Sequence, residues 1–364
     1  MTRKMAFHTP KNDFVQSRTK CSVVRFFLMR FALENNSLNN MKYLSKFLFT
    51  LLAITALAGC VGEKGVSANY EVPEESQRNS MYYWKTVFEL DSAELSFLQK
   101  HSIKRLYLRM FDVATEPDVL NGGVEIVPIA TTKFVSSVPD GVEIVPVAYI
   151  TIDALRAMAG METKFASLIV ERLLAMASYN KCGKINELQL DCDWTSNTKD
   201  IYSGLCETVK DSLDSKGIEL SITVRLHQMQ ETPPPADRGV LMLYNTGALK
   251  SPNTCNSILD CDDVKPYLEQ MKYEIPLDYA YPVFGWGVKF VNNRFSSIVS
   301  DDHGELSENE CVRYERAAPD EILEVKGLVE QSFGKPASGN ILYHLDDKQL
   351  KNYTDDEISQ ILLY

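Results

Sequence analysis

The sequence predicts an α/β protein of the (β/α)₈ TIM-barrel class, with an insertion between the seventh and eighth strands. Short apolar runs alternate with helical or loop segments, as they do in parallel sheets. Eight such runs follow residue 78, the number of strands that closes a barrel, and roughly 285 residues is a usual length for that fold. The composition, 45% hydrophobic and 24% charged, is that of a globular domain.

Each predicted strand is a short run rich in apolar and β-branched residues. The eight strands are 81–86, 105–112, 142–151, 187–194, 219–227, 240–245, 277–284 and 340–345. Helices are expected where apolar residues recur every three or four positions. These helices are 91–101, 164–178, 199–215, 264–271 and 320–333.

Two segments depart from a regular alternation of strand and helix. The hexapeptide GVEIVP occurs at 123–128 and again at 141–146. The first copy predicts an extra strand or hairpin where a helix would normally follow the second strand. The second departure is 290–339, an insertion that contains strand-like RFSSIV and CVRYE before a helix. An insertion after the seventh strand lies on the C-terminal face of a barrel, where it can wall a cleft.

The N-terminal region resembles a bacterial lipoprotein signal. In MKYLSKFLFTLLAITALAGC, residues 41–60, two lysines precede a short apolar run that ends in Leu-Ala-Gly-Cys. The resemblance implies cleavage before Cys60 and a lipid on that cysteine, which would attach the chain to a membrane of the bacterial cell envelope, on the outer membrane or its periplasmic face. The alternative is a core helix that ends in small residues.

This segment sets the expected organisation of the chain. Residues 1–40 are expected to be an over-extended start, 41–59 the signal peptide and 60–78 a polar, lipid-attached tether. The stretch 79–364 is expected to be a single barrel domain. In an exported chain Cys255 and Cys261 are candidates for a short-loop disulfide, with free thiols as the alternative.

Charge and cysteine spacing exclude some functions. A net charge of -11 argues against a nucleic-acid groove, which needs clustered Lys and Arg, so we expect a neutral or cationic partner instead. The cysteines and histidines have no zinc-ligand spacing, so no metal and no cofactor are expected.

Polar side chains converge on the C-terminal ends of the predicted strands. Because side chains two apart in a strand share a face, Asp191 and Asp193 lie together at the end of the fourth strand. Arg225 and His227 follow the same alternation in the fifth strand, and Arg109 does so in the second. Since the lumen face of each strand end commonly forms the site of a barrel, we expect one polar cluster here.

Three motifs lie in order along the chain: LDCDW at 190–194, LMLYNTG at 241–247 and PVFGWGV at 282–288. Together they resemble the fourth, sixth and seventh strands of family-18 glycoside hydrolases, the chitinase-like barrels. The resemblance implies a barrel that takes a glycan or oligosaccharide. It also implies that Thr195 stands at the position of that family's catalytic glutamate and Asn245 at that of its sixth-strand aspartate, so chitinase-type catalysis is not carried over.

Asp191 and Asp193 are therefore the candidate catalytic pair. If both ionise they repel each other, which would raise one pKa and let Asp193 act as an acid. The alternative is a buried Asp-Arg network with Arg225 that only closes the barrel layer. His227 is either an acid/base or a hydrogen-bonded wall residue. Glu231 and Glu315 are loop acids that could replace the missing glutamate.

Aromatic residues at strand ends complete the candidate site, because flat rings stack on the apolar faces of sugars. Trp84, Tyr244, Tyr281 and Trp286 are candidates, while Trp194 shares the apolar face of its strand and is expected in the core. The expected substrate-binding residues are Arg109, Arg225, His227, Tyr244, Asn245, Tyr281 and Trp286.

The leading hypothesis is a lipid-anchored, glycoside hydrolase-like barrel that acts on or binds glycans at the bacterial envelope. The first alternative is a surface lipoprotein that binds glycans without catalysis, and the second is a structural envelope protein.

Overall fold

The computed structural model describes residues 78–120, 122–269, 272–299 and 306–364. The barrel domain lies within the unit Asn69–Tyr364. The predicted signal segment, Cys60 and residues 60–77 of the tether lie outside the described residues. In the part of the chain that the structure describes, no helix is both long and apolar enough to cross a membrane.

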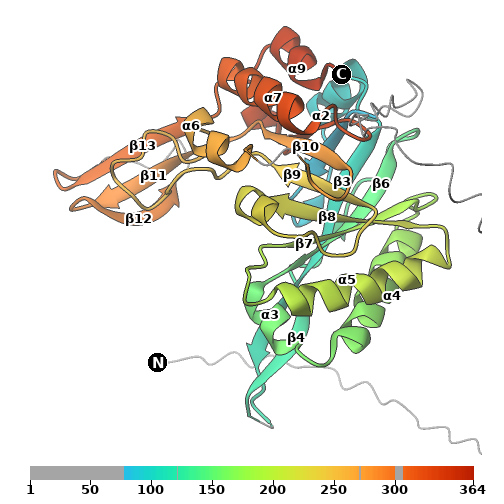
Figure 1. Cartoon of the computed structure of the whole chain (residues 1–364). Coiled ribbons are helices and arrows are strands. Elements are labelled where there is room, and N and C mark those ends of the chain that lie inside the picture. The colour runs from blue at the N-terminus through green and yellow to red at the C-terminus, as the bar shows by residue number, and fades with distance from the viewer. Residues whose placement is uncertain (1–77, 121, 270–271, 300–305) are drawn as a thin grey trace, which may run out of the picture. The chain divides into compact units, whose positions relative to one another are not determined.

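Eight parallel strands form a closed barrel, as predicted (Figure 1). The sheet closes because β1 pairs with β14 on one side and with β3 on the other. In sheet order the strands are β1 (Ser80–Tyr83), β3 (Arg105–Pro117), β6 (Glu143–Ile150), β7 (Glu187–Cys192), β8 (Glu219–Arg225), β9 (Arg238–Met242), β10 (Leu277–Pro282) and β14 (Asn340–Tyr343). The eight predicted strands are all present, with ends shifted by a few residues.

Helices cover the outside of the barrel. They are α2 (Ser92–Lys100), α3 (Ile152–Ala157), α4 (Glu162–Tyr179), α5 (Lys199–Asp214), α6 (Cys261–Val264), α7 (Pro319–Phe333), α8 (Asp347–Leu350) and α9 (Asp355–Leu362), with the 3₁₀ turns η2 (Leu226–Gln230) and η3 (Lys265–Tyr267). Local sequence explains the clearest ones: Asp91 and Glu94 form a capping box at the start of α2, and α5 buries one stripe that includes Tyr202 and Leu213.

The first GVEIVP copy forms an extra strand, as predicted. This strand, β4 (Val124–Ile129), pairs antiparallel with the last six residues of β3, so a hairpin stands where a helix would otherwise follow. The short strands β2 (Val87–Phe88) and β5 (Lys133–Phe134) pair beside it. The second GVEIVP copy lies in the barrel strand β6, where it is far more buried than the first. The same six residues therefore take different positions according to their neighbours.

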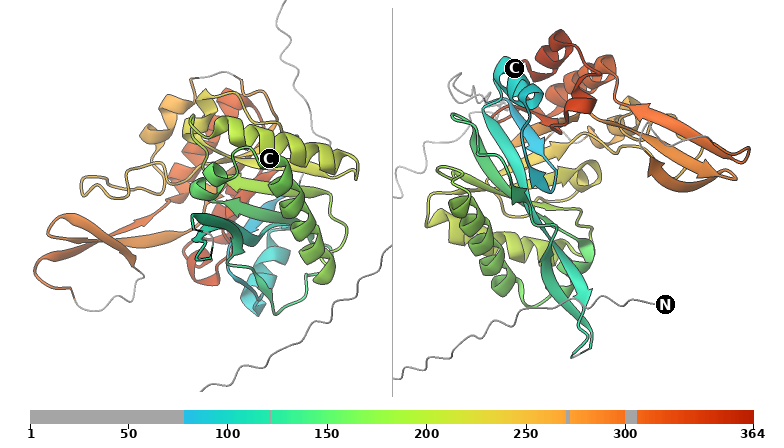
Figure 2. Two further views of the ribbon diagram at one scale, coloured as in Figure 1. Left: turned by 90° about the horizontal axis from the view of Figure 1, so that it is seen from below. Right: turned by 180° about the vertical axis from the view of Figure 1, so that it is seen from behind.

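The predicted insertion is a small antiparallel sheet. It contains β11 (Gly285–Val291), β12 (Arg294–Val299) and β13 (Glu310–Arg316), with β11 in the middle. It begins directly after β10, five residues earlier than the predicted start at residue 290, and it extends away from the barrel in both figures (Figures 1 and 2). Because it follows the C-terminal end of a barrel strand, its base lies beside the predicted polar cluster.

Side chains fill the inside of the barrel as well as the space under the helices. The lumen cluster is Tyr82, Tyr107, Val145, Val147, Val240, Met242, Ala280 and Ile341. At the N-terminal ends of the strands, the Glu187 carboxylate forms ion pairs with Arg238 at 2.8 Å and with Arg105 at 3.6 Å. Arg238 also lies 3.5 Å from the buried carboxylate of Asp278. This ion-pair network and the rings above it fill the lower barrel, and the predicted polar cluster lies at the opposite, C-terminal end of the strands.

Candidate functional site

The two aspartates of the fourth barrel strand meet one arginine. Arg225, the last residue of β8, has its Nη2 atom 3.0 Å from Asp191 Oδ1, and its Nε donates to Asp193 Oδ1. Thr223 also donates to Asp191, at 2.6 Å. The Asp191 side chain is 4% exposed and that of Asp193 is 46% exposed. The structure thus brings together three residues of the predicted cluster, and of the two acids Asp193 is the one that reaches solvent.

Electrostatics separate the roles of these groups. Burial raises the pKa of the Asp191 carboxyl, although the charge of Arg225 and the Thr223 hydrogen bond oppose the rise. Burial alone would lower the pKa of Arg225, but the negative charges around it, Asp191 first, raise it well above the usual value. Arg225 therefore stays charged. The predicted alternative of a buried Asp-Arg network describes Asp191, while Asp193 remains accessible.

A second ion pair lies on β3, which is separated from β7 by β6. Arg109 Nε donates to Asp112 Oδ1 at 2.6 Å, and both side chains are mostly buried. The Arg109 guanidinium also lies over the Trp84 ring, 5.7 Å from its centroid. The predicted residue Arg109 is thus the fifth residue of β3, held by Asp112 and in contact with an aromatic face.

Tyr149, on the strand between these two ion pairs, was not singled out in the sequence. It pairs in register with Asp191 and is half-buried. Burial and the charges of Asp193 and Asp191 raise the pKa of its hydroxyl to about 12, so Tyr149 is a neutral hydrogen-bond donor at ordinary pH. Its place at the end of the strand VPVAYI, level with the aspartates, was the signal that could have found it.

Aromatic rings continue from Trp84 around the same end of the barrel. Tyr343 lies 5.8 Å from Trp84 and stacks on Tyr244 with centroids 4.5 Å apart. Phe284 then contacts Tyr244 edge-on at 5.8 Å and Trp286 at 5.2 Å. These five rings form what we call the aromatic row. All except the buried Phe284 are half-buried, so part of each is accessible.

The aromatic row and the ion pairs belong to one site. The charges of Asp191, Arg225 and Arg109 all act on Tyr343, and the side chain of Tyr244 forms a hydrogen bond with it. Two members of the row, Tyr343 and Phe284, were missed in the sequence. Tyr343, the last residue of β14, and Phe284 were each counted only as part of a predicted strand.

Three predicted binding residues lie outside this cluster. β8 ends at Arg225 and the chain turns into η2, so the alternation stops and His227 is exposed on that turn. Tyr281 is fully buried in the core that faces the helices, because its neighbour Ala280 is the β10 residue that points into the lumen. Asn245 is exposed in a left-handed conformation, φ 56°, after β9 has ended. The predictions for His227 and Tyr281 are therefore wrong in position.

Both loop acids are engaged by other side chains. Glu315 is buried and accepts hydrogen bonds from the Ser257 backbone, the Ser257 hydroxyl, Trp286 Nε1 at 2.9 Å and Arg313 Nε at 2.5 Å. Glu231 pairs with Lys199 at 3.0 Å. Thr195 is exposed and has no ionisable proton near neutral pH. Glu315 instead holds Trp286 at the end of the aromatic row.

Two other expectations can be compared with the structure. Trp194 is 1% exposed and stacks near Tyr202, as expected for a core residue. Cys255 and Cys261 are free thiols, and Cys261 Sγ donates to Glu324 at 3.2 Å, so the predicted disulfide is absent from this pair. Among the described residues, no three His, Cys, Asp or Glu side chains are grouped closely enough to hold a metal ion.

Comparisons with known proteins give a likeness of fold. No family model matches the sequence, and no curated protein does. A chitinase from Chromobacterium violaceum superposes with a TM-score of 0.50 at 12% identity, over 78% of this chain and 98% of that one. The spore cortex-lytic enzyme SleL of Bacillus megaterium gives 0.49 at 12%, over 79% and 75%. A GH18 chitinase from Flavobacterium johnsoniae gives 0.47 at 16%, over 78% and 93%.

The chitinase superposition confirms the predicted fold class. The eight parallel strands, closed into a barrel and surrounded by helices, are shared over nearly the full length of that enzyme. At 12% identity the likeness concerns the fold, so what this chain does has to be argued from its own side chains.

Proposed function

We propose that this chain is a glycoside hydrolase-like barrel that binds glycans at the bacterial envelope, without chitinase-type hydrolysis. The observation that carries the proposal is the aromatic row beside Asp193 and Arg225 at the C-terminal end of the barrel strands. The fold likeness to an enzyme named as a chitinase directs the choice of ligand class to a glycan.

The row is suited to sugars for physical reasons. Exposed parts of Trp84, Tyr244, Tyr343 and Trp286 offer flat apolar faces, on which the C–H surfaces of pyranose rings pack. Next to them, Asp193 accepts hydrogen bonds and the neutral Tyr149 hydroxyl donates them. A few fixed polar groups within a largely apolar surface are the usual composition of a small-molecule site.

The same geometry argues against hydrolysis of the chitinase type. Such catalysis needs a protonated acid next to the glycosidic oxygen. Thr195 cannot supply one, Asp191 is sealed by Thr223 and Arg225, and Asp193 is held by Arg225 as an ion pair. Its Oδ1 oxygen already accepts a hydrogen bond from Arg225 Nε, so the contact that the structure shows for Asp193 is that of an acceptor.

One observation favours hydrolysis as a second candidate. Asp193 is 46% exposed at the C-terminal end of the strands, so a substrate could reach it and displace its contact with Arg225. In that case Asp193 would be the acid, and removing its carboxyl would abolish turnover.

The experiment that separates the two candidates measures binding and cleavage on the same panel of soluble oligosaccharides. With the full chain, calorimetry should detect saturable binding of at least one glycan, and reducing-end assays should detect no release. Tyr244→Ala and Trp84→Ala should each weaken binding on the order of tenfold, since stacked rings contribute up to about 1.5 kcal/mol beyond their buried area. Tyr179→Ala, which removes an exposed tyrosine on α4, is the matched control and should leave binding unchanged.

Asp193→Asn decides between binding and catalysis. If the barrel only binds, the variant should keep its glycan affinity within a few fold, because an amide oxygen still accepts hydrogen bonds. Release of reducing ends that disappears in Asp193→Asn would instead establish the hydrolase. Absence of binding across the whole panel would refute both candidates.

We further propose that Cys60 carries the lipid that anchors the barrel, with residues 60–78 as its tether. The proposal is supported by the lipobox-like Leu-Ala-Gly-Cys after a short apolar run. Metabolic labelling with an alkyne fatty acid should mark the wild-type chain in a bacterial host and not Cys60→Ala. Equal labelling of the two, or a wild-type chain that stays with the soluble fraction, would contradict the anchor.

A further inference from the structure

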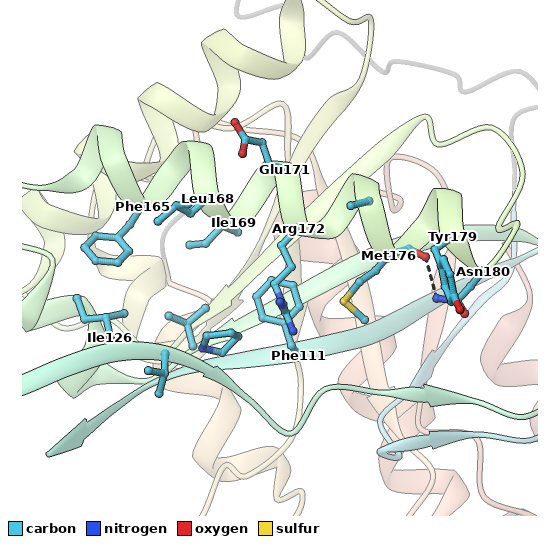
Figure 3. Close-up of a pocket in the computed structure, with 14 residues that line it drawn as sticks. Phe111, Ile126, Phe165, Leu168, Ile169, Glu171, Arg172, Met176, Tyr179 and Asn180 are labelled. Carbon is cyan, nitrogen blue, oxygen red and sulfur yellow. Dashed lines mark hydrogen bonds between the residues drawn. The ribbon is translucent and has the colours of Figure 1, made fainter. Parts of the chain in front are cut away.

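An apolar groove runs along the outside of the barrel between α4 and the β3–β4 hairpin (Figure 3). It has a volume of about 700 Å³ and 14 lining residues, most of them apolar. It exists because β3 is followed by a hairpin instead of a helix, so the side of α4 that such a helix would cover stays open. The groove is thus separate from the aromatic row, which lies at the strand ends.

The groove is elongated along α4. Its α4 wall runs from Phe165 past Leu168, Arg172 and Met176 to Asn180, one stripe of the helix, which corresponds to about 22 Å at 1.5 Å per residue. The opposite wall is formed by the outward side chains of β3 and by β4. Leu168 remains 49% exposed, which is high for a leucine facing other apolar side chains. A linear apolar ligand would fit this shape.

Arg172 lies in the middle of the groove with its charge unpaired. Every other arginine of the described residues that is not exposed has a carboxylate within 4.0 Å: Arg78, Arg105, Arg109, Arg225, Arg238 and Arg313. No such ion pair is formed by Arg172 with a described carboxylate. Its guanidinium lies 5.0 Å from the Phe111 ring centroid and donates from Nη2 to Thr131 at 3.0 Å.

The Nε atom of Arg172 also lacks a hydrogen-bond acceptor, and it is buried from solvent. A buried donor without a hydrogen-bond acceptor is destabilising. The one acidic lining residue, Glu171, extends from the opposite side of α4, away from Arg172 (Figure 3). The groove therefore combines a long apolar channel with one unneutralised cation.

We propose that this groove binds an amphiphile with a single alkyl chain and an anionic head group. The head, a carboxylate or a phosphate, accepts from the Nη atoms at the end of the Arg172 guanidinium and neutralises its charge, in a charge-assisted hydrogen bond. The alkyl chain lies along Phe165, Leu168 and Ile126 and covers the apolar wall. A volume of about 700 Å³ is within the usual range of small-molecule sites. The proposal does not depend on glycan binding.

Chain length gives the first test. With the full chain, calorimetric titration of octanoate, decanoate and dodecanoate below their micelle concentrations should show saturable binding with one site. Each added methylene should tighten Kd up to about fourfold, the effect of burying one CH₂ group. Comparing the Kd of dodecyl phosphate with that of dodecanoate then tells whether the groove prefers a phosphate or a carboxylate head group. Dodecyltrimethylammonium, with the opposite charge, should bind far more weakly than either.

Two groove variants and one control locate the site. Arg172→Met keeps an unbranched apolar stem without the guanidinium and should weaken dodecanoate binding by on the order of tenfold or more, because it removes a charged hydrogen bond. Ala175→Trp places a large ring in the groove from an exposed position and should abolish binding while leaving Arg172 in place. Arg156→Met removes an exposed arginine of α3 and should bind as the wild type does.

Several outcomes would overturn the proposal. They are the absence of saturable binding by every anionic amphiphile, a Kd that does not depend on chain length, and wild-type affinity in Arg172→Met or Ala175→Trp. A dimer that Leu168→Asp dissociates, without any amphiphile binding, would assign the groove to a second copy of the chain instead. Loss of glycan binding in Tyr244→Ala or Trp84→Ala would not change the expected amphiphile binding, so each of the two proposals can fail without the other.

Discussion

Arg225 determines what each acid of the fourth barrel strand does. Asp191 lies deeper, accepts from both Thr223 and Arg225 and is almost fully buried, whereas Asp193 contacts the same guanidinium from the solvent side. Two carboxylates on one face of a strand thus differ in exposure about tenfold. Their spacing in the sequence puts both carboxylates on that face. Their contacts with Thr223 and Arg225 make Asp191 the buried, structural acid and Asp193 the accessible one.

Removing the deeper acid should destabilise the barrel far more than removing the outer one. Asp191→Ala leaves Arg225 mostly buried with its outer partner alone, so we expect a loss of about 3–5 kcal/mol in the free energy of unfolding. Asp193→Ala removes a half-exposed partner and should cost about 1 kcal/mol or less. Urea denaturation of both variants measures the difference. Equal losses would show that Asp191 is not the structural member of the pair.

Glu143 should make part of the stability depend on acid pH. Burial raises the pKa of its carboxyl, but the hydrogen bond from Asn186 and the contacts with Arg105 and Arg78 outweigh this and lower it. Since its pKa is lower in the folded than in the unfolded chain, the stability it contributes is complete above the unfolded value of 4.5 and is lost as pH falls through the folded value.

The corresponding measurement compares wild type with Glu143→Gln. The wild type should be the more stable at about pH 7, and the difference should shrink progressively below about pH 4.5. Urea midpoints recorded across this range test it. A difference that stays constant down to about pH 3 would mean that the carboxylate charge is not responsible.

Among the elements, the inserted sheet illustrates how one buried side chain connects distant segments. Glu315 on β13 accepts from Trp286 on β11, from Arg313 on its own strand and from Ser257 in the loop after β9. Its side chain is fully buried. The sheet is therefore joined to the barrel loops at its base through one carboxylate, and Trp286 is oriented by the same contact.

Glu315→Ala should loosen this sheet without unfolding the barrel. It leaves Arg313 and the Trp286 N–H without their acceptor, and unpaired buried donors destabilise their surroundings. Hydrogen exchange should accelerate in β11 and β13 and remain nearly unchanged in β7 and β8, because local stability varies within a fold. Glu315→Gln, which keeps an acceptor oxygen, is the control and should show a smaller effect. Uniform acceleration across all strands would argue against a local role.

For the molecule as a whole, closure of the barrel depends on close backbone contact at the last strand. β14 joins β10 to β1, and Gly339 immediately precedes it. A Cβ atom at Gly339 would lie 2.3 Å from the Arg78 carbonyl oxygen, next to the start of β1. The first and last segments of the described chain thus meet at a position where only glycine fits.

Gly339→Ala should therefore destabilise the entire barrel. We expect a loss of about 1–3 kcal/mol, the usual cost of overpacking. The control is Gly327→Ala in α7, where a Cβ would meet nothing within 4 Å. There the gain in helix propensity should stabilise the protein by roughly 0.5–1 kcal/mol. Urea denaturation followed by circular dichroism measures both, and an unaffected Gly339→Ala would contradict the closure argument.

The barrel itself was predictable because its signals are local. Each apolar run of strand length, and each of the longer amphipathic helices, can be recognised within a short window of the sequence. The helices that were missed, α3, α8 and α9, have only six, four and eight residues, too few to show a clear period. His227 is misplaced because β8 ends two residues before it, so the alternation of the strand does not reach it. Tyr281 is misplaced because the alternation along β10 is offset by one residue, which exchanges the side chains that point inward and outward.

The sequence by itself determined the order and type of the main elements and the extra strand formed by the first GVEIVP copy. Only the tertiary structure decided which aspartate is buried, which aromatic residues form the row, and that Arg172 faces an open groove. The physical reason is that these properties depend on contacts between residues far apart in the chain. Arg225 meets Asp191 across 34 positions, and Arg172 meets Thr131 across 41. Such pairs form only when the barrel closes.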